Sequence, residues 1–265
     1  MPTSFPSAST ALITGASHGI GLALARELAA HGHPLILTAR STEQLEQVAT
    51  DLSSRHGIVV TVIPLDLTDP GAPSRLIKEI AARNLTVDIL VNNAGFGLKG
   101  PFAHTALARE LEMIHLNIAA LTTLTKLALP HMLSRRAGRI LNLASTAAFQ
   151  PGPLMAVYYA SKAYVLHFSE AIAEELRDTG VTVTALCPGP TRTRFATDAG
   201  MRTARMEKSP FMMDVDDVAR FGYRAMMRGQ RVAIPGFLNQ CVAFGTRFVP
   251  RRVAATLARL SQEHR

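Results

Sequence analysis

The strongest constraint on the fold is an alternation between two kinds of segment along the first 190 residues. Long amphipathic stretches, such as 20–30 and 158–177, separate short runs rich in β-branched and aliphatic residues. These runs are "TALIT", "PLILTA", "VVTVIPL", "VDILVN", "GRILNLAS" and "VTVTALC". Such alternation, with strands that are apolar almost throughout, is typical of a parallel sheet buried on both faces. The sequence therefore predicts a single α/β domain over residues 1–265, a Rossmann-like, doubly wound parallel sheet with helices on both faces.

Composition excludes several other classes of protein. With 265 residues, 48% hydrophobic and 18% charged, the chain can bury a substantial core and lacks a disordered signature. Its two cysteines, Cys187 and Cys241, lack metal-ligand spacing, so no metal site and a reducing cytoplasm are expected. The N-terminal "MPTSFPSAST" lacks the basic and apolar regions of a signal peptide, and no apolar run is long enough to cross a bilayer.

The net charge of +8 is concentrated near the end of the chain. Nine arginines and a single acid, Glu263, follow residue 219, and this excess equals the net charge of the whole sequence. Such a distribution puts no basic stripe on the fold itself and argues against a nucleic-acid binder. Val253, Leu257 and Leu260 recur at helical spacing after Pro250, so residues 236–265 are interpreted as a basic amphipathic extension in two pieces. Its alternative roles are a lid, an oligomer contact or a peripheral contact with an anionic membrane.

A glycine-rich turn, "TGASHGIG", follows the first predicted strand. Glycine lets the backbone approach a ligand closely, and the N-terminus of the next helix offers free N–H groups to a phosphate. The spacing is G-x-x-x-G-x-G rather than G-x-G-x-x-G, and a turn without a ligand is the alternative. Its place at the first strand–helix junction favours a dinucleotide site. The residues of this site would be Gly15, Ser17, His18, Gly19, Ile20 and Gly21.

The second predicted strand is followed by Ala39 and Arg40. An acid after this strand binds the ribose 2′-hydroxyl of NAD, whereas an arginine suits the 2′-phosphate of NADP. Arg40 can make a charge-assisted contact with that phosphate, and His18 is a second candidate donor. We therefore expect NADP(H) as the cofactor, with a solvated surface arginine as the alternative.

Several motifs together resemble the short-chain dehydrogenase/reductase family. They occur in the family's order and cover residues 10–194. They are "TGASHGIG" at 14–21, "LDLTD" at 65–69, "NNAG" at 92–95, Asn117 in "HLNIAA", Ser145 in "NLAST", "YYASK" at 158–162 and "CPGPTRT" at 187–193. The texture of "PGPLMAVYYASKA" resembles the branch of long-chain acyl, steroid-like and general carbonyl reductases.

The resemblance implies a set of cofactor contacts. Asp66 would bind the adenine, and Asn93 would line the adenosine ribose and stabilise the central sheet. The turn at Pro188 would hold the nicotinamide carboxamide and the pyrophosphate. The other contacts implied are Leu67, Ala94, Gly95, Gly189, Thr191 and Thr193, with Tyr158 and Lys162 at the nicotinamide end.

The stretch "AVYYASKAY" offers more than one tyrosine to a single lysine. The family pattern is Tyr-x-x-x-Lys, and Tyr158 lies four residues before Lys162 on the same helix face. Tyr159 lies three residues before it, which also permits a neighbouring position. The family serine precedes the tyrosine by about thirteen residues, which pairs Ser145 with Tyr158. Tyr158 is therefore favoured, and Tyr159, with the hydroxyl of Thr146, is the alternative.

These residue types suit the reduction of a carbonyl, which needs a hydride at carbon and a proton at oxygen. A free tyrosine has a pKa of about 10, so a nearby Lys162 ammonium is expected to lower the pKa of Tyr158. Ser145 can hydrogen-bond the developing oxyanion. By resemblance, Lys162 also contacts the nicotinamide ribose, and Asn117 holds a water that links Lys162 to solvent. Without the resemblance, Asn117 is better interpreted as a buried residue that satisfies backbone groups.

The expected function is an NADPH-dependent oxidoreductase that reduces a hydrophobic carbonyl, of ketone or 3-oxoacyl type, to an alcohol. Three regions are expected to shape the substrate pocket: residues 147–156, a loop over 190–214 and the C-terminal extension. Apolar residues of the loop are Phe195, Met201, Met206, Phe211, Met212 and Met213, and packing against the sheet is their alternative role. The rival function is a non-catalytic NADP-binding scaffold or redox-sensing regulator. A homodimer or homotetramer is implied by the resemblance alone.

Overall fold

The computed structural model describes residues 9–193, 195 and 211–263. Seven strands form one parallel sheet in the order β3-β2-β1-β4-β5-β6-β7. They are β1 (Ala11–Thr14), β2 (Leu35–Thr38), β3 (Val60–Val62), β4 (Ile89–Asn92), β5 (Gly138–Leu143), β6 (Val181–Leu186) and β7 (Val232–Ala233). The strand order reverses between β1 and β4, where doubly wound sheets bind their ligands. The predicted fold class is therefore confirmed.

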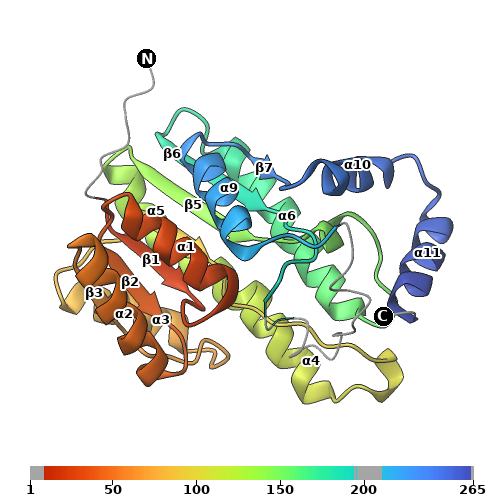
Figure 1. The fold of residues 1–265 in the computed structure, drawn as a ribbon, viewed down its shortest axis with the longest axis horizontal. Coiled ribbons are helices and arrows are strands. Elements are labelled where there is room, and N and C mark those ends of the chain that lie inside the picture. Colours follow the sequence, from red (N-terminus) through yellow and green to blue (C-terminus); the bar gives the residue numbers. More distant parts are fainter. Residues whose placement is uncertain (1–8, 194, 196–210, 264–265) are drawn as a thin grey trace.

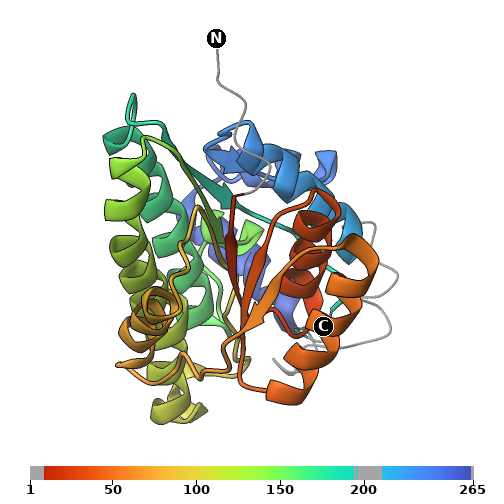
Figure 2. The ribbon, with the colours of Figure 1, turned by 90° about the vertical axis from the view of Figure 1, so that its left-hand side faces the viewer.

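Helices cover both faces of this sheet, which is seen nearly edge-on in Figure 2. They are α1 (Gly19–Ala30), α2 (Thr42–His56), α3 (Ala72–Ala82), α4 (Leu107–Ile114), α5 (Leu121–Ser134), α6 (Ala156–Glu175), α9 (Val215–Met227), α10 (Phe237–Gly245) and α11 (Arg251–Glu263). Helices α1, α2 and α9 pack against one face, and α3, α5 and α6 against the other. Short turns η1 (Phe102–His104), η2 (His115–Ala120) and η3 (Thr146–Phe149) complete the described chain.

The apolar strands serve two cores at once. Ala11 and Ile13 of β1 belong to the cluster that contains α1 and α9, whereas Leu12 belongs to the cluster that contains α3 and α5. Successive side chains of a strand point to opposite faces, so a strand covered on both sides must be apolar at every position. This explains why the runs noticed in the sequence do not alternate with polar residues.

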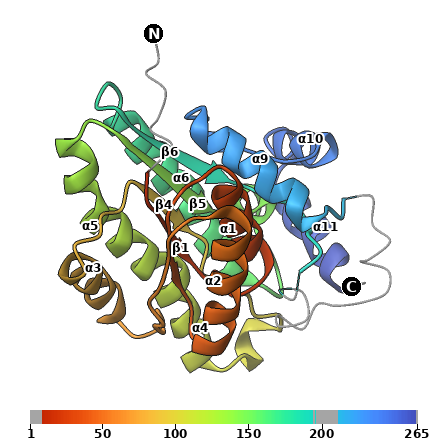
Figure 3. The ribbon, with the colours of Figure 1, turned by 60° about the vertical axis from the view of Figure 1, so that its left-hand side comes forward.

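The C-terminal helices lie apart from the main layers. β7 forms the edge of the sheet opposite β3, and α10 follows it directly. Figures 1 and 3 place α10 and α11 together at the end of the molecule away from α3. Pro250 stands between these two helices, at the break expected from the sequence. Within the described ranges, no helix has both the length and the apolar character needed to cross a membrane.

Close packing of α1 against the end of β1 depends on Gly21. A Cβ at this position would lie 2.3 Å from the carbonyl oxygen of Gly15 and 2.4 Å from Nδ2 of Asn93. Both are far below van der Waals contact, and one of the two atoms belongs to the backbone. Only glycine therefore lets the helix begin where it does.

We predict that Gly21→Ala lowers the free energy of unfolding by about 2 kcal/mol or more, because the added methyl forces α1 away from the strand. Gly245→Ala is the matched control, since a Cβ there meets nothing within 4 Å. The control is expected to be neutral or slightly stabilising, because alanine favours a helix. Urea unfolding of both variants measures the difference, and equal stabilities would contradict the packing role of Gly21.

Candidate active site

A cavity of about 980 Å³ opens at the carboxyl ends of the strands. Segments that follow β1, β2, β3, β4, β5 and β6 all contribute to its lining, as do α10 and α11. Every predicted site residue lines this cavity except Gly21 and Asn117. The structure therefore brings together motifs that are spread over nearly 180 residues of sequence, from Gly15 to Thr193.

The glycine-rich turn is held at the switch point between β1 and β4. Nδ2 of Asn93 donates hydrogen bonds to the carbonyl oxygens of Thr14 (2.9 Å) and Gly15 (3.1 Å). The Thr14 hydroxyl accepts in return from the backbone N–H groups of Asn93 (3.0 Å) and Ala94 (2.9 Å). Gly15 has φ +65° and Gly19 has φ +58°, a region of backbone conformation that favours glycine. Gly19 and Ile20, the first residues of α1, line the cavity, and the free N–H groups of a helix N-terminus can bind an anion.

The predicted adenosine end of the site lies beyond this turn. Arg40 is exposed and borders the cavity directly after β2. Ser41 caps α2, because its hydroxyl accepts a hydrogen bond from the N–H of Gln44 (3.3 Å). Asp66 is also exposed, and its Oδ1 accepts from both the N–H (2.9 Å) and the hydroxyl (2.8 Å) of Thr68. Arg40 and Asp66 are thus fixed to the ends of neighbouring strands, on one side of the turn.

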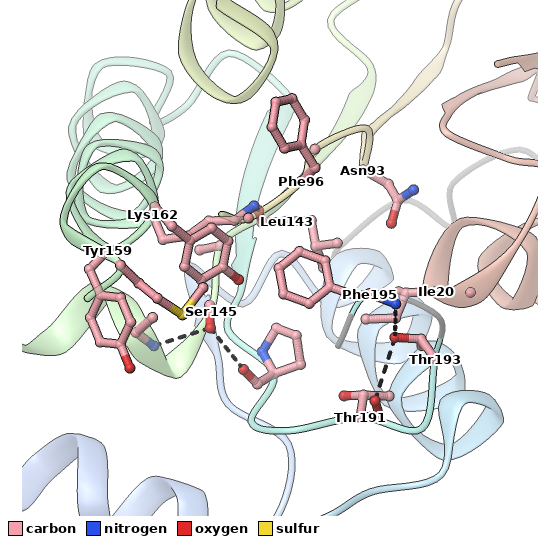
Figure 4. A pocket seen from close by; sticks show the side chains of 18 of the residues that line it. Ile20, Asn93, Phe96, Leu143, Ser145, Tyr159, Lys162, Thr191, Thr193 and Phe195 are labelled. Carbon is pink, nitrogen blue, oxygen red and sulfur yellow. Dashed lines mark hydrogen bonds between the residues drawn. The ribbon is translucent and has the colours of Figure 1, made fainter. Parts of the chain in front are cut away.

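The predicted catalytic serine stands at the end of β5 and caps the η3 turn. Its hydroxyl accepts from the N–H of Ala147 (3.1 Å) and lies 3.4 Å from the Pro188 carbonyl oxygen, to which it donates (Figure 4). Pro188 begins the segment after β6 that carries Thr191 and Thr193. Ser145 therefore ties the ends of β5 and β6 together at the cavity wall.

Lys162 is buried, with 5% of its surface exposed, and its Nζ donates a 2.7 Å hydrogen bond to the Leu143 carbonyl oxygen. Burial lowers the pKa of this ammonium to about 8, against an opposing effect of Cys187. Burial also raises the pKa of Tyr158, while a hydrogen bond with Ser145 acts in the opposite direction. The expected lowering of the Tyr158 pKa is therefore wrong for this geometry. The loss of hydration on burial is the main effect on the Tyr158 pKa. The Nζ of Lys162 lies 5.8 Å from the centre of the tyrosine ring.

The two adjacent tyrosines occupy different surroundings. The ring centroids of Tyr158 and Phe195 lie 5.3 Å apart, and the Tyr158 hydroxyl is hydrogen-bonded to Ser145. The Tyr159 hydroxyl instead accepts a 2.9 Å hydrogen bond from Nε2 of Gln262 in α11. In Figure 4 the Tyr159 hydroxyl points away from Ser145 and Lys162. This geometry favours Tyr158 over Tyr159 as the partner of Ser145 and Lys162.

Asn117 lies behind the cavity, in the π-helical turn η2 between α4 and α5. Nδ2 donates to the Phe96 carbonyl oxygen (3.0 Å) and the Ser161 hydroxyl (3.0 Å), and Oδ1 accepts from the Phe96 N–H (3.2 Å). Asn117 is therefore a buried residue that satisfies backbone groups, which is the alternative that the sequence offered without the family resemblance. Gly95 separates Asn117 from Lys162, since a Cβ there would lie 2.8 Å from Oδ1 and 3.7 Å from Nζ.

The substrate side of the cavity contains residues that the sequence did not single out. Arg109 pairs with Glu112 and stacks on Phe96, with its guanidinium 4.6 Å from the ring centre. Gln262 of α11 is 2% exposed, and its Oε1 has no partner among the described residues. No local sequence pattern identifies Arg109 or Gln262, because their positions at the cavity depend on how α4 and α11 pack. Of the predicted loop, Phe195 and Phe211 line the cavity, while Met201 and Met206 lie outside the described residues.

A family model for short chain dehydrogenases matches residues 9–203. The chain belongs to the short-chain dehydrogenase family. Mouse 17-beta-hydroxysteroid dehydrogenase type 3 is 39% identical over 181 residues, which cover 67% of this chain and 58% of that protein. The very-long-chain 3-oxoacyl-CoA reductase of Anas platyrhynchos is 38% identical over 184 residues, covering 67% and 58%. The chain thus matches less than two thirds of either relative's length, and the pair confirms the predicted resemblance to the steroid and long-chain acyl branch.

A solved structure of the family has a similar fold over most of the chain. A short-chain dehydrogenase from Sphingobium yanoikuyae in complex with NADPH has a TM-score of 0.81 and 33% sequence identity. The similarity covers 91% of this chain and 93% of that one. Most of the fold described above is therefore shared with a family member that was solved with NADPH.

We predict that Lys162→Met raises the free energy of unfolding at neutral pH by about 1–3 kcal/mol, because it removes a buried ammonium. Between the folded pKa of about 8 and the ordinary value of 10.5, the unfolded chain holds a proton that the folded chain lacks. Wild-type stability therefore rises with pH through this window, and the advantage of the variant shrinks there. Urea unfolding at neutral pH and near pH 10 measures this, with the exposed Lys126→Met as control. A constant or growing advantage would contradict the assignment.

Proposed function

We propose that this chain is an NADPH-dependent oxidoreductase that reduces a hydrophobic ketone or 3-oxoacyl carbonyl to an alcohol. One observation carries the proposal. The hydroxyls of Ser145 and Tyr158 and the ammonium of Lys162 meet in one cavity that also contains the glycine-rich anion site. A binding scaffold without turnover, the rival function, has no need of this buried group, whose lysine is held at a cost in stability.

The residues present fit a dinucleotide phosphate. The N-terminus of α1 is free of acidic residues in its first turn, and its cap residue His18 makes no side-chain cap hydrogen bond. His18, Gly19 and Ile20 would hold the pyrophosphate, Asp66 and Leu67 the adenine, and Asn93 with Ala94 and Gly95 the adenosine ribose. Thr191 and Thr193 would hold the nicotinamide end. Arg40 and the absence of an acid after β2 favour a 2′-phosphate, and the Sphingobium relative was solved with NADPH.

In this proposal the cofactor supplies a hydride to the carbonyl carbon. Ser145 donates a hydrogen bond to the carbonyl oxygen and holds it beside Tyr158. Tyr158, kept protonated by its raised pKa, donates its hydroxyl proton to that oxygen as negative charge develops. The Lys162 ammonium, which predominates below about pH 8, stabilises the tyrosinate that results. Asn117 would hold the water through which Lys162 exchanges protons with solvent.

The proposed substrate is large and apolar. Phe96, Met155, Phe195 and Phe211 line the substrate side of the cavity, with Leu257 from α11. Their flexible and aromatic side chains suit a bulky hydrophobic body, and a cavity of about 980 Å³ holds one beside a nucleotide. The names of the two relatives above refer to a hydroxysteroid and to a very-long-chain 3-oxoacyl-CoA, and both are large apolar substrates of the kind proposed here.

We also propose a cytoplasmic homodimer or homotetramer. Both cysteines are free, Cys187 buried and Cys241 exposed, which is compatible with a reducing compartment. Leu107, Leu111 and Ile114 expose their side chains along α4, and an apolar helix face of this kind is suited to a subunit contact. The C-terminal helices are a separate candidate surface for an oligomer or membrane contact.

Tyr158→Phe is expected to reduce kcat/KM by about a hundred- to ten-thousand-fold, because it removes the group that delivers the proton. NADPH oxidation against long-chain 3-oxoacyl thioesters, steroid ketones, aliphatic aldehydes and diketones measures the effect. Tyr159→Phe is the matched control and is expected to retain most of the activity. The Tyr158 assignment is abandoned if the control, rather than Tyr158→Phe, removes turnover; NADPH binding without turnover of any carbonyl favours the scaffold.

Arg40→Ala is expected to raise the Kd for NADPH about 10- to 100-fold, because a charge-assisted hydrogen bond to the 2′-phosphate is lost. The Kd for NADH, which lacks this phosphate, should stay unchanged. Fluorescence titration measures both constants without any need for a substrate. Arg26→Ala, an exposed arginine of α1 outside the cavity lining, is the control. An unchanged NADPH affinity in Arg40→Ala would show that Arg40 is merely solvated.

A further inference from the structure

Exposed apolar side chains are concentrated on the two C-terminal helices. Among the described residues, eight of the sixteen exposed large hydrophobic side chains lie between residues 237 and 260. They are Phe237, Leu238, Val242, Phe244, Phe248, Val253, Leu257 and Leu260. A patch of this kind on a protein surface marks a contact with a partner or a membrane.

Apolar residues of α10 and of the turn after it form a stripe. Phe237, Cys241 and Phe244 of α10 recur at helical spacing, and the Phe244 ring packs edge to face with that of Phe248, just beyond the helix, with centroids 5.2 Å apart. Phe237 is 76% exposed and Phe248 73%, the highest values among the exposed large hydrophobic residues described. On α11, Ala254, Ala258 and Gln262 are buried, whereas Val253, Leu257 and Leu260 are exposed.

Arginines border this stripe. Arg247 lies 5.9 Å from the centre of the Phe244 ring, and Arg251 and Arg252 are exposed at the start of α11. Over residues 236–263 the sequence contains one acid, Glu263, and it pairs with Arg259. A second copy docked on this face about a two-fold axis would bring arginines against arginines. An anionic lipid surface would neutralise them while the aromatic side chains enter its boundary region.

The same helices border the cavity from its outer side. Val242, Val249 and Leu257 line it, and Val242 and Leu257 are also exposed on the surface. Figures 1 and 3 show α10 and α11 at the same end of the molecule, one after the other along the chain. We propose that α10 and α11 dock on an anionic phospholipid bilayer, so that a membrane-dissolved substrate enters the cavity between them. The entry of substrate rests on the proposed function, whereas the docking does not.

Sedimentation with vesicles tests the docking. The full chain is expected to bind vesicles of phosphatidylcholine with phosphatidylglycerol at low salt, and to bind weakly to phosphatidylcholine alone or at high salt. The double variant Phe244→Ser with Phe248→Ser should bind at least about tenfold more weakly. Arg251→Glu with Arg252→Glu should have a similar effect, because two favourable charges become repulsive.

Matched control variants distinguish docking through α10 and α11 from non-specific binding to vesicles. Val59→Ser removes an exposed apolar residue beside β3, at the opposite edge of the sheet. Arg26→Glu with Arg55→Glu reverses two exposed charges on α1 and α2. Both controls should bind vesicles as the wild type does, and thermal unfolding confirms that all variants fold. The proposal is overturned if the wild type stays in solution, or if the α10 and α11 variants bind as tightly as the controls. It is also overturned if the phenylalanine variant only changes the oligomeric state in the absence of vesicles.

A second readout tests substrate entry. Turnover of a long-chain ketone carried in vesicles should fall in the phenylalanine variant, while turnover of a water-soluble ketone stays unchanged. Neither residue lines the cavity, so a loss of both activities would contradict the entry route. If no variant turns over any ketone but the vesicle results stand, the proposed function fails and the docking remains.

Discussion

The hydrogen bonds between the end of β1 and the end of β4 support the rest of the site. Four hydrogen bonds join Thr14 and Gly15 to Asn93 and Ala94, and they use the Thr14 hydroxyl, the Asn93 amide and backbone groups. They position the glycine-rich turn at the start of α1, and they also position the segment from Asn93 to Gly95. Gly95 in turn lies between Asn117 and Lys162. Neighbouring residues therefore connect the glycine-rich turn to Lys162, and a shift at the switch point would move both.

Much of this site could be predicted because its motifs follow strands. The carboxyl ends of parallel strands meet along one edge of a sheet, so residues placed just after β1, β2, β4, β5 and β6 must converge once the fold class is known. Ser145 and Tyr158 were singled out by the resemblance to the family pattern, and both line the cavity. Gly21 and Asn117 were placed in the right motifs, but they pack behind the cavity rather than in it.

Other features lay beyond any sequence pattern. The contact between Gln262 and Tyr159 joins residues 103 positions apart and depends on where α11 comes to rest. Whether the pKa of Tyr158 is raised or lowered depends on how completely the ring is buried, and the spacing of residues in the sequence does not reveal this. Burial disfavours ionisation of the tyrosine and of the lysine alike, so the same packing that shields the site from water keeps the lysine close to losing its proton. The burial that shapes this pair therefore opposes folding stability at Lys162.

The hydrogen bond from Gln262 to Tyr159 also bears on how such chains diverge. The family match ends at residue 203, whereas α10 and α11 follow it and form one wall of the cavity. A descendant that exchanged only this last segment would keep the glycine-rich turn, Ser145, Tyr158 and Lys162, but its cavity wall would suit different substrates. Such an exchange would also change the hydrogen bonding of the Tyr159 hydroxyl, because Gln262 of α11 donates to it here.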